Sequence, residues 1–293
     1  MQIGFIGVGA MGERVARRLI KHGHDVGVFA RRAGASGPLI DAGAREFSSP
    51  AAVAEHSEIL FTMVTATSDV EQVLFGSAGV SAGGRAGLLV VDMSTIDPAA
   101  AGTFPQRLAA KGIGLLDAPV SGGPEGAEQG TLTVMCGGPA DLFERARPLF
   151  ECFGTTILHM GPHGTGQSTK ACHQLLLLVT AEGVAEALTL ASRSGVDPVR
   201  VREAMMAGIA SSRVLDRFGA RMADRQFEAG IAARLYRKDI GIVFHAACTL
   251  GVNLPAGQVV RDHLDRLFDR GLAESDLSAL ITVVESAAKS EGA

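Results

Sequence analysis

The first 160 residues of the chain alternate between short apolar runs and segments in which apolar residues recur with a helical period. Strands that alternate with helices in this way are typical of a doubly wound α/β domain with a mainly parallel sheet. We therefore predict such a domain in the first half of the chain. Its predicted strands are residues 2–7, 25–29, 59–64, 88–93, 114–118, 131–136 and 155–160.

Two helix starts in this half are well marked. Ser49 precedes Pro50 and Asp97 precedes Pro98, so each capping side chain stands ahead of a proline at the first helical position. By contrast, the segment 122–126 contains three glycines and a proline, which is too many for a regular element. It predicts a loop between the last strands.

Beyond about residue 164 the strand pattern stops, and the remaining chain has the pattern of an all-α domain. The predicted helices are residues 165–194, 198–207, 211–224, 235–250 and 255–270. We therefore predict two domains, an α/β domain over 1–161 and an all-helical domain over 162–293.

Composition and charge narrow the class of protein. Of 293 residues, 47% are hydrophobic and 20% charged, which excludes a disordered or fibrous protein. Up to residue 161 there are 12 Lys and Arg against 16 Asp and Glu, and after it 15 against 15, so neither half has the positive excess of a nucleic-acid-binding protein. The four cysteines lack CxxC spacing, so we expect reduced thiols and no metal site.

The N-terminal residues enter an apolar strand without a charged leader or a cleavage site, so we expect no export signal. No apolar run approaches the roughly 18 residues of a membrane span. We therefore expect a cytoplasmic protein without a membrane partner.

One glycine motif in the α/β half points to a ligand. It matches G-x-G-x-x-G between the first predicted strand and an amphipathic helix, and it consists of Gly7, Val8, Gly9, Ala10, Met11 and Gly12. In this setting the glycines allow a tight turn and a close backbone approach to a pyrophosphate at a helix N-terminus. We predict a dinucleotide site here; the alternative is a glycine turn that binds nothing.

The end of the second strand indicates which dinucleotide is favoured. NAD enzymes usually have a carboxylate there for the adenosine ribose, but this chain has Ala30-Arg31-Arg32. Arg offers paired donors to phosphate oxygens, which suits a ribose 2′-phosphate. We predict NADP(H) as the favoured cofactor and NAD(H) as the second choice, the alternative being that both arginines are ordinary solvated charges.

Hydride transfer involving a nicotinamide needs a proton donor or acceptor beside the substrate carbonyl. The sole tyrosine, Tyr236, has Ile240 rather than a lysine four residues on, which excludes a Tyr-x-x-x-Lys mechanism. Lys170, His173 and Gln174 fall at i, i+3 and i+4 of a predicted helix and so share one face. We predict that Lys170 donates or accepts the proton; the alternative is a surface lysine beside a core histidine.

These residues resemble the β-hydroxyacid dehydrogenase family, which includes 3-hydroxyisobutyrate dehydrogenase, tartronate semialdehyde reductase and L-threonate dehydrogenase. The resemblance spans nearly the whole chain and depends on four motifs in order: Phe5 to Gly12, Asp117-Ala118-Pro119-Val120-Ser121-Gly122-Gly123 through Leu132, Gly164-Thr165-Gly166-Gln167 to Lys170, and Lys238-Asp239. It implies a Rossmann domain followed by a helical substrate and oligomerisation domain. It also implies reversible, NAD(P)-dependent oxidation of a small hydroxy acid by a homodimer or homotetramer.

The resemblance implies roles for single residues as well. Lys170 matches the catalytic lysine, and Ser121, Gly122 and Gly123 match the loop that holds the substrate carboxylate. Further catalytic and substrate-binding residues are Ser121, His173, Gln174 and Asp239. The cofactor-lining residues outside the glycine motif are Met63, Val64, Thr65, Ser94, Thr95 and Lys238. For Lys238 and Asp239 the alternative is an ion pair on a helix surface.

Two departures from the family pattern keep alternatives open. Most members have Asn at the position of His173, and histidine there resembles the L-threonate dehydrogenase branch, whose enzymes generally favour NAD. Arg31 and Arg32 point instead to NADP(H). The alternatives are an NAD-dependent aldonate dehydrogenase, an imine reductase or a non-catalytic dinucleotide-binding scaffold, and the presence of Lys170 argues against the last two.

Overall fold

The computed structural model describes residues 1–228 and 230–290. The chain forms two compact units, Met1–Lys170 and Ala171–Ala293, and the change from one to the other falls inside helix α9 (Thr165–Arg193). Because α9 continues through this point without a break, the domain boundary predicted between residues 161 and 162 stays a prediction.

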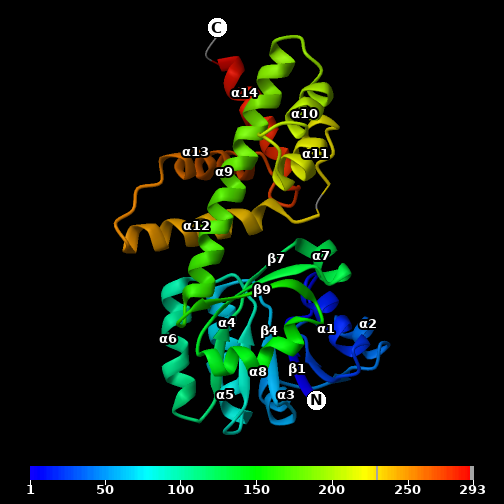
Figure 1. Cartoon of the computed structure of the whole chain (residues 1–293), viewed down its shortest axis with the longest axis vertical. Coiled ribbons are helices and arrows are strands. Elements are labelled where there is room, and N and C mark those ends of the chain that lie inside the picture. Colours follow the sequence, from blue (N-terminus) through cyan, green and yellow to red (C-terminus); the bar gives the residue numbers. More distant parts are fainter. Residues whose placement is uncertain (229, 291–293) are drawn as a thin grey trace. The chain divides into compact units, whose positions relative to one another are not determined.

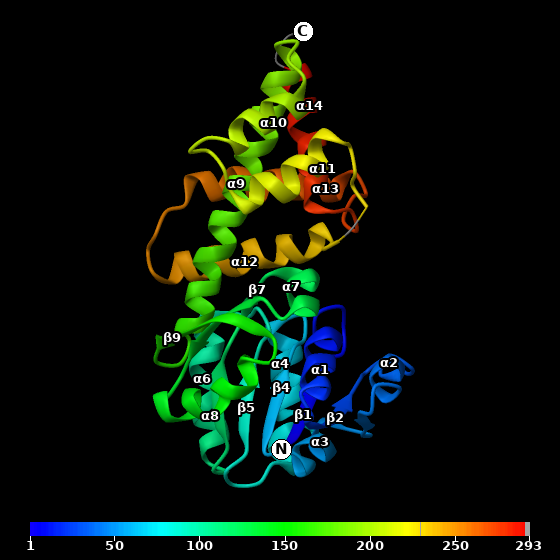
Figure 2. The same ribbon diagram turned by 45° about the vertical axis from the view of Figure 1, so that its right-hand side comes forward.

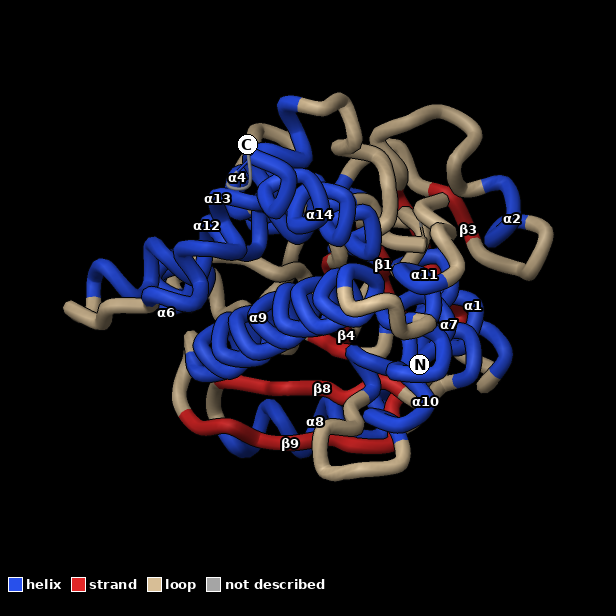
Figure 3. Tube along the Cα trace, turned by 90° about the horizontal axis from the view of Figure 1, so that it is seen from above, coloured by secondary structure: helices blue, strands red, loops and turns tan. Residues whose placement is uncertain are grey.

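Within the described residues, nine strands of the first unit form one sheet in the order β3-β2-β1-β4-β5-β6-β8-β7, with β9 paired to β8. Only the pairs β6–β8 and β7–β8 are antiparallel, so the predicted mainly parallel sheet is confirmed. Figure 3 shows β8 and β9 side by side. The strands are β1 (Gln2–Ile6), β2 (Asp25–Phe29), β3 (Arg45–Glu46), β4 (Ile59–Thr62), β5 (Leu89–Asp92), β6 (Gly114–Asp117), β7 (Val120–Ser121), β8 (Leu132–Gly137) and β9 (Gly154–Gly161).

Helices cover both faces of this sheet, because alternate strand residues point to opposite sides and both sides are apolar. Phe5 and Phe61 pack in one core with residues of α1 (Gly12–Lys21), α2 (Gly37–Ile40), α7 (Gly123–Gln129) and α8 (Ala140–Phe150). Leu60 and Val90 pack in a second core with α3 (Pro50–His56), α4 (Thr67–Phe75), α5 (Val80–Gly83) and α6 (Pro98–Ala109). The result is the predicted doubly wound α/β fold, with helices on both faces of the sheet (Figure 1).

Both marked helix starts are confirmed. The Ser49 hydroxyl accepts a hydrogen bond from the backbone N–H of Ala52 at 3.1 Å, and the Asp97 carboxylate accepts one from Ala99 at 2.8 Å. Each cap satisfies an N–H group that has no partner within its own helix.

The loop predicted over residues 122–126 is wrong, because helix α7 begins at Gly123. Two of the glycines lie at its start, where Gly122 and Gly123 have φ of +134° and +66°, and Gly130 ends it with φ of +74°. Pro124 occupies the first turn, where a missing N–H costs nothing. The glycines therefore turn the chain into and out of the helix instead of preventing it.

The second unit is helical in all of its described elements, as predicted (Figure 2). Besides α9 they are α10 (Pro198–Met206), a π-helical turn (Leu215–Gly219), α11 (Ala220–Ala223), α12 (Ala233–Thr249), α13 (Pro255–Asp269), a 3₁₀ turn (Leu277–Ala279) and α14 (Leu280–Ser290). The helix predicted over 211–224 is thus shorter, spanning residues 213–223, and contains a π turn; α14 is an additional helix that the sequence did not predict.

Helix α9 is long and apolar enough to cross a membrane by length and composition alone. However, Leu178, Ala181, Ala185 and Leu188 are buried in the core of the second unit, where they pack with residues of the other helices. A core helix meets the same criteria of length and composition, and we interpret α9 as one.

Candidate active site

The three glycines of the predicted dinucleotide motif differ in their surroundings. Gly7 has φ of +100°, and a Cβ there would lie 2.2 Å from the carbonyl oxygen of Met63. A Cβ on Gly12 would lie 1.9 Å from the carbonyl oxygen of Gly7, so helix α1 packs closely on the turn after β1. Gly9 has no atom within 4 Å of where its Cβ would be. Its exposed backbone at the start of α1 leaves room for a pyrophosphate, so the site fits a dinucleotide.

The other motif residues complete this turn. Val8 is buried, Met11 is half-buried and Ala10 is exposed. The backbone N–H of Glu13 donates to the carbonyl oxygen of Gly9 at 2.9 Å, so the first helical turn already begins at Gly9. The N–H groups that begin a helix have no partner within it and in general point along its axis, as an anion site requires.

Arg31 and Arg32 follow β2 and are both exposed. Arg31 forms an ion pair with Asp69, with 3.2 Å between Nη1 and Oδ1, and its side chain is 89% exposed. The other oxygen of Asp69 accepts the N–H of Ala66 at the start of α4. An exposed pair of this kind contributes little to stability, so Arg31 can exchange Asp69 for a phosphate at low cost.

Hydrogen bonds join the segment after β4 to the segment after β5. These two segments contain the remaining residues of the first unit that were predicted to line the cofactor. The backbone N–H of Val64 donates to the Ser94 hydroxyl at 2.9 Å, and the N–H of Ser94 donates to Asp92 at 3.2 Å. Met63 and Thr95 are half-buried, and Thr65 is exposed. Ser94 itself is buried, and its hydrogen bond to Val64 ties the two segments together at the carboxyl ends of β4 and β5, where ligands of open α/β sheets bind.

Lys170 lies beside the predicted carboxylate loop. It is only 7% exposed, and its Nζ donates to the carbonyl oxygen of Val120 at 2.8 Å. Val120 and Ser121 form β7, and Gly122 and Gly123 follow directly. The structure thus brings Lys170 and Ser121–Gly123 together within the first unit, and it excludes the alternative of a surface lysine.

The first turn of α9 is held by Asp117, which lies at the carboxyl end of β6 and is 2% exposed. Its Oδ1 accepts the N–H of Gly164 at 2.8 Å, and its Oδ2 accepts the N–H of Gln167 at 2.9 Å. Burial raises the pKa of Asp117 to about 6; the nearby Asp92 carboxylate adds to this rise, and the backbone hydrogen bonds oppose it. This clamp fixes the start of the helix that carries Lys170.

Sequence reasoning missed Asp117 and Gln167 as site residues, although both stand in the motifs that it named. A signal was present, because a buried strand that ends in a carboxylate is unusual unless the carboxylate has partners. Both β5 and β6 end in this way, at Asp92 and Asp117.

The predicted site residues of the second unit form a chain of polar contacts. Nδ1 of His173 donates to the side-chain oxygen of Gln174 at 2.9 Å, and Nε2 of Gln174 donates to Oδ2 of Asp239 at 2.5 Å. Oδ1 of Asp239 lies 2.9 Å from Nζ of Lys238. Gln174 and Asp239 are buried, so this network is more than a surface ion pair.

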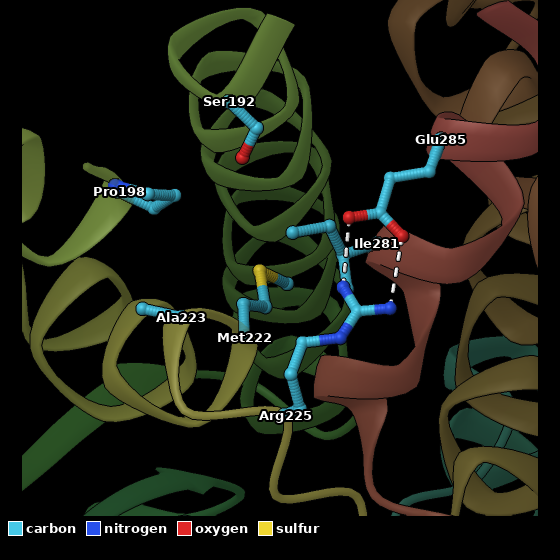
Figure 4. Close-up of a pocket in the computed structure, with 7 residues that line it drawn as sticks. All are labelled: Ser192, Pro198, Met222, Ala223, Arg225, Ile281 and Glu285. Atoms are coloured by element: carbon cyan, nitrogen blue, oxygen red, sulfur yellow. Dashed lines mark hydrogen bonds and ion pairs between the residues drawn. The ribbon is translucent and has the colours of Figure 1, made fainter. Parts of the chain in front are cut away.

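A cavity of about 320 Å³ in the second unit contains none of the predicted site residues. Arg225 and Glu285 meet in it through two hydrogen bonds of 2.7 and 2.9 Å (Figure 4). The two charges neutralise each other, and Arg225 has φ of +57°, in the left-handed region. We interpret this pair as a structural contact.

Over residues 1–228 and 230–290, no three His, Cys, Asp or Glu side chains are placed to hold a metal ion. Cys136 and Cys152 are buried thiols, whereas Cys172 and Cys248 are exposed.

Two family models match the chain. The model for the NAD binding domain of 6-phosphogluconate dehydrogenase matches residues 2–161. The model for the NAD-binding domain of NADP-dependent 3-hydroxyisobutyrate dehydrogenase matches residues 164–284. Among individual relatives, the 2-hydroxy-3-oxopropionate reductase of Escherichia coli is 40% identical over 97% of each chain.

The chain belongs to the β-hydroxyacid dehydrogenase family. As a member of this family it is an NAD(P)-dependent oxidoreductase that transfers hydride reversibly between a hydroxy acid and its oxo form. A 3-hydroxyisobutyrate dehydrogenase of Pseudomonas aeruginosa is 37% identical over 89% of this chain and 90% of its own. The crystal structure of a 3-hydroxyisobutyrate dehydrogenase from Salmonella typhimurium has a TM-score of 0.87 at 29% identity, covering 96% of this chain and 99% of that one.

Gly9→Ala is expected to weaken cofactor binding at least about tenfold without lowering Tm, because the added methyl group meets only the space left for the pyrophosphate. Fluorescence titration with NADPH and thermal unfolding measure the two effects. Gly102→Ala is the matched control, since its Cβ also meets no atom within 4 Å but lies in α6. Unchanged NADPH affinity in Gly9→Ala would contradict the placement of the cofactor.

Asp117→Asn is expected to flatten the pH dependence of stability. The pKa of Asp117 is about 6 in the folded chain against 3.8 ordinarily, so its contribution is fully present below about pH 4 and is lost as the pH rises through about 6. The loss amounts to about 3 kcal/mol, and the asparagine variant lacks it. Urea unfolding at about pH 4 and pH 7 measures it.

The exposed Asp141 provides a control for Asp117, because Asp141→Asn removes a carboxylate from the same unit without changing a buried one. If Asp117→Asn shows the same pH dependence as the wild type and this control, the raised pKa is not located at Asp117.

Proposed function

We propose that the chain reduces and oxidises a small polyhydroxylated acid, with NADP(H) as the preferred cofactor and Lys170 as the general acid and base. The observation that carries this proposal is the position of Lys170. Its Nζ is buried and lies 2.8 Å from the carbonyl oxygen of Val120, at the start of the loop Ser121–Gly123. A proton donor thus lies next to a loop of hydroxyl and N–H groups suited to a carboxylate.

The nicotinamide, when bound, supplies the hydride in reduction and takes it up in oxidation. The residues of the chain bind the substrate and transfer the proton. The hydroxyl of Ser121 and the N–H groups of Gly122 and Gly123 hold the substrate carboxylate. In reduction Lys170 gives its proton to the oxygen of the aldehyde group as the carbon gains hydride, and in oxidation it accepts the hydroxyl proton. Lysine suits both directions because, unlike arginine, it can release a proton near neutral pH.

His173 and Gln174 contact the substrate hydroxyl groups in this proposal. The hydrogen bond between them, and that from Gln174 to Asp239, fix both side chains and so favour one orientation of a polar ligand. Lys238 contributes to the cofactor site, with Asp239 as its ion-pair partner. The contacts to ligand rest on the resemblance of these positions to the family pattern.

Two observations support a polyhydroxylated acid. The Escherichia coli relative is named for 2-hydroxy-3-oxopropionate, which has a carboxylate, a hydroxyl and an aldehyde, and histidine at position 173 resembles the L-threonate branch. That branch makes an NAD-dependent aldonate dehydrogenase the second candidate. Relative kcat/KM decides between them: the highest value for 2-hydroxy-3-oxopropionate or D-glycerate with NADP(H) supports the first candidate, and the highest value for L-threonate with NAD⁺ supports the second. A preference for 3-hydroxyisobutyrate would exclude both.

The wider setting follows the same resemblance. We place the enzyme in the cytoplasm as a homodimer or homotetramer, with residues 1–161 binding the cofactor and residues 162–293 serving substrate binding and assembly. Sedimentation of the purified enzyme tests the assembly, and a monomer at working concentration would overturn it.

Lys170→Ala is expected to lower kcat by about 10²- to 10⁴-fold while cofactor affinity changes little, because only proton transfer is lost. Lys170→Arg keeps the charge but is expected to lose most of the activity as well. Nicotinamide absorbance gives kcat, and fluorescence titration gives the Kd of NADPH. Lys21→Ala, at the exposed end of α1, is the control. Near-normal turnover in Lys170→Ala would rule out Lys170 as the general acid and base.

The double variant Arg31→Ala, Arg32→Ala is expected to raise the KM of NADP⁺ about tenfold to hundredfold and to leave that of NAD⁺ almost unchanged. Each charge-assisted hydrogen bond to phosphate contributes about 1.5–3 kcal/mol, and NAD⁺ lacks that phosphate. Steady-state kinetics with both cofactors measure the effect, with the exposed Arg17→Ala as control. Equal losses for the two cofactors would assign the arginines to general electrostatics.

A further inference from the structure

The buried side-chain amide of Gln167 forms hydrogen bonds through both its oxygen and its nitrogen to one backbone segment, residues 94–96. Gln167 lies in the first turn of α9 and is 1% exposed. Its Oε1 accepts the N–H of Ile96 at 3.1 Å, and its Nε2 donates to the carbonyl oxygen of Ser94 at 2.7 Å. An apolar side chain of the same size would leave two buried backbone groups without partners, so only an amide fits this position well.

The segment that Gln167 holds is linked to the other predicted cofactor-lining segment. The hydroxyl of Ser94 accepts the N–H of Val64, and the N–H of Asp97 donates to the hydroxyl of Thr67 at 3.2 Å. A displacement of residues 94–96 would therefore also affect the backbone after β4.

Gln167 also belongs to α9, the helix that carries Lys170. The backbone N–H of Gln167 donates to Asp117, and Lys170 follows at i+3, one turn further on the same face of α9. Gln167 thus links the segment 94–96, through its side chain, to the turn that carries Lys170.

We propose that Gln167 is a positioning residue that holds the segment Ser94–Ile96 and Lys170 in one rigid piece, so that hydride and proton reach the same carbonyl group. This inference rests on the proposed roles of Lys170 and of the segment after β5. A shift of about 1 Å in such an arrangement costs about a hundredfold in rate, because the reacting atoms must be in contact and aligned.

Gln167→Met and Gln167→Glu test this proposal in different ways. Methionine removes both hydrogen bonds at nearly unchanged volume, and we expect kcat to fall about tenfold to hundredfold while the Kd of NADPH changes less than about threefold. Glutamate keeps an acceptor for Ile96 but, when ionised, faces the carbonyl oxygen of Ser94 with a second oxygen. Its protonated form restores the missing donor.

Gln167→Glu is therefore expected to approach wild-type kcat as the pH is lowered. Asp92 and Asp117, at the ends of β5 and β6, disfavour its ionisation, whereas Lys170 one turn on favours it. Because Asp117 also titrates in the wild type, the quantity compared is the ratio of variant to wild-type kcat at each pH, corrected for the folded fraction from circular dichroism. Gln106→Glu, on the exposed side of α6, is the control and should keep a constant ratio.

Amide hydrogen exchange provides a readout that does not depend on catalysis. Gln167→Met should speed exchange in residues 94–97 and 164–170 but not in β2. Unchanged exchange would overturn the clamp. Faster exchange with unchanged kcat would show that Gln167 holds the segment but does not position the reacting groups. The same conclusion would follow if the ratio of Gln167→Glu kcat to wild-type kcat did not vary with pH. If Lys170→Ala stays active while exchange still rises, the proposed role of Lys170 fails and the clamp remains.

Discussion

The carboxylate of Asp117 is the contact on which the rest of the site depends. A helix begins with N–H groups that have no partner within it, and here two of them, from Gly164 and Gln167, donate to one buried side chain from the end of β6. The sheet therefore supplies the cap for α9. Because burying a carboxylate is costly, such a contact persists only when both oxygens are satisfied, and this makes the position of the helix start well defined.

Close backbone approach makes this contact possible. A Cβ on Gly166 would lie 2.5 Å from the carbonyl oxygens of both Asp117 and Met135, and one on Gly137 would lie 2.6 Å from the Asp117 carboxylate. Any larger residue at either position would push the helix away from the sheet. The glycines around α9 are thus needed for contact between elements. In the G-x-G-x-x-G motif, Gly7 and Gly12 are needed for packing, whereas Gly9 faces open space, where we propose that the cofactor binds.

The sheet also aligns the polar groups beneath the candidate site. Thr62, Asp92 and Asp117 are in register on three neighbouring parallel strands, and the hydroxyl of Thr62 donates to Asp92 at 2.7 Å. In the same row, Asp92 accepts the N–H of Ser94 in the segment after β5, and Asp117 accepts the N–H groups of Gly164 and Gln167 at the start of α9. The segment proposed to line the cofactor and the helix that carries Lys170 are therefore built from adjacent strand ends, which would let one fold hold the two proposed reacting groups in fixed positions.

The sequence by itself determined the mainly parallel sheet, the helical second half and the dinucleotide motif, and it led to the proposal for Lys170, because these depend on periodicity, on glycine spacing and on motifs that are local in the chain. Only the tertiary structure decided that Asp117 holds the start of α9 through Gln167, that Arg31 has Asp69 as its partner and that Gln174 is fixed by Asp239. Each of these contacts joins residues far apart in sequence. The reason is physical: a local pattern reports which side chains prefer burial or a turn, but which buried polar groups satisfy one another is known only once the elements have packed.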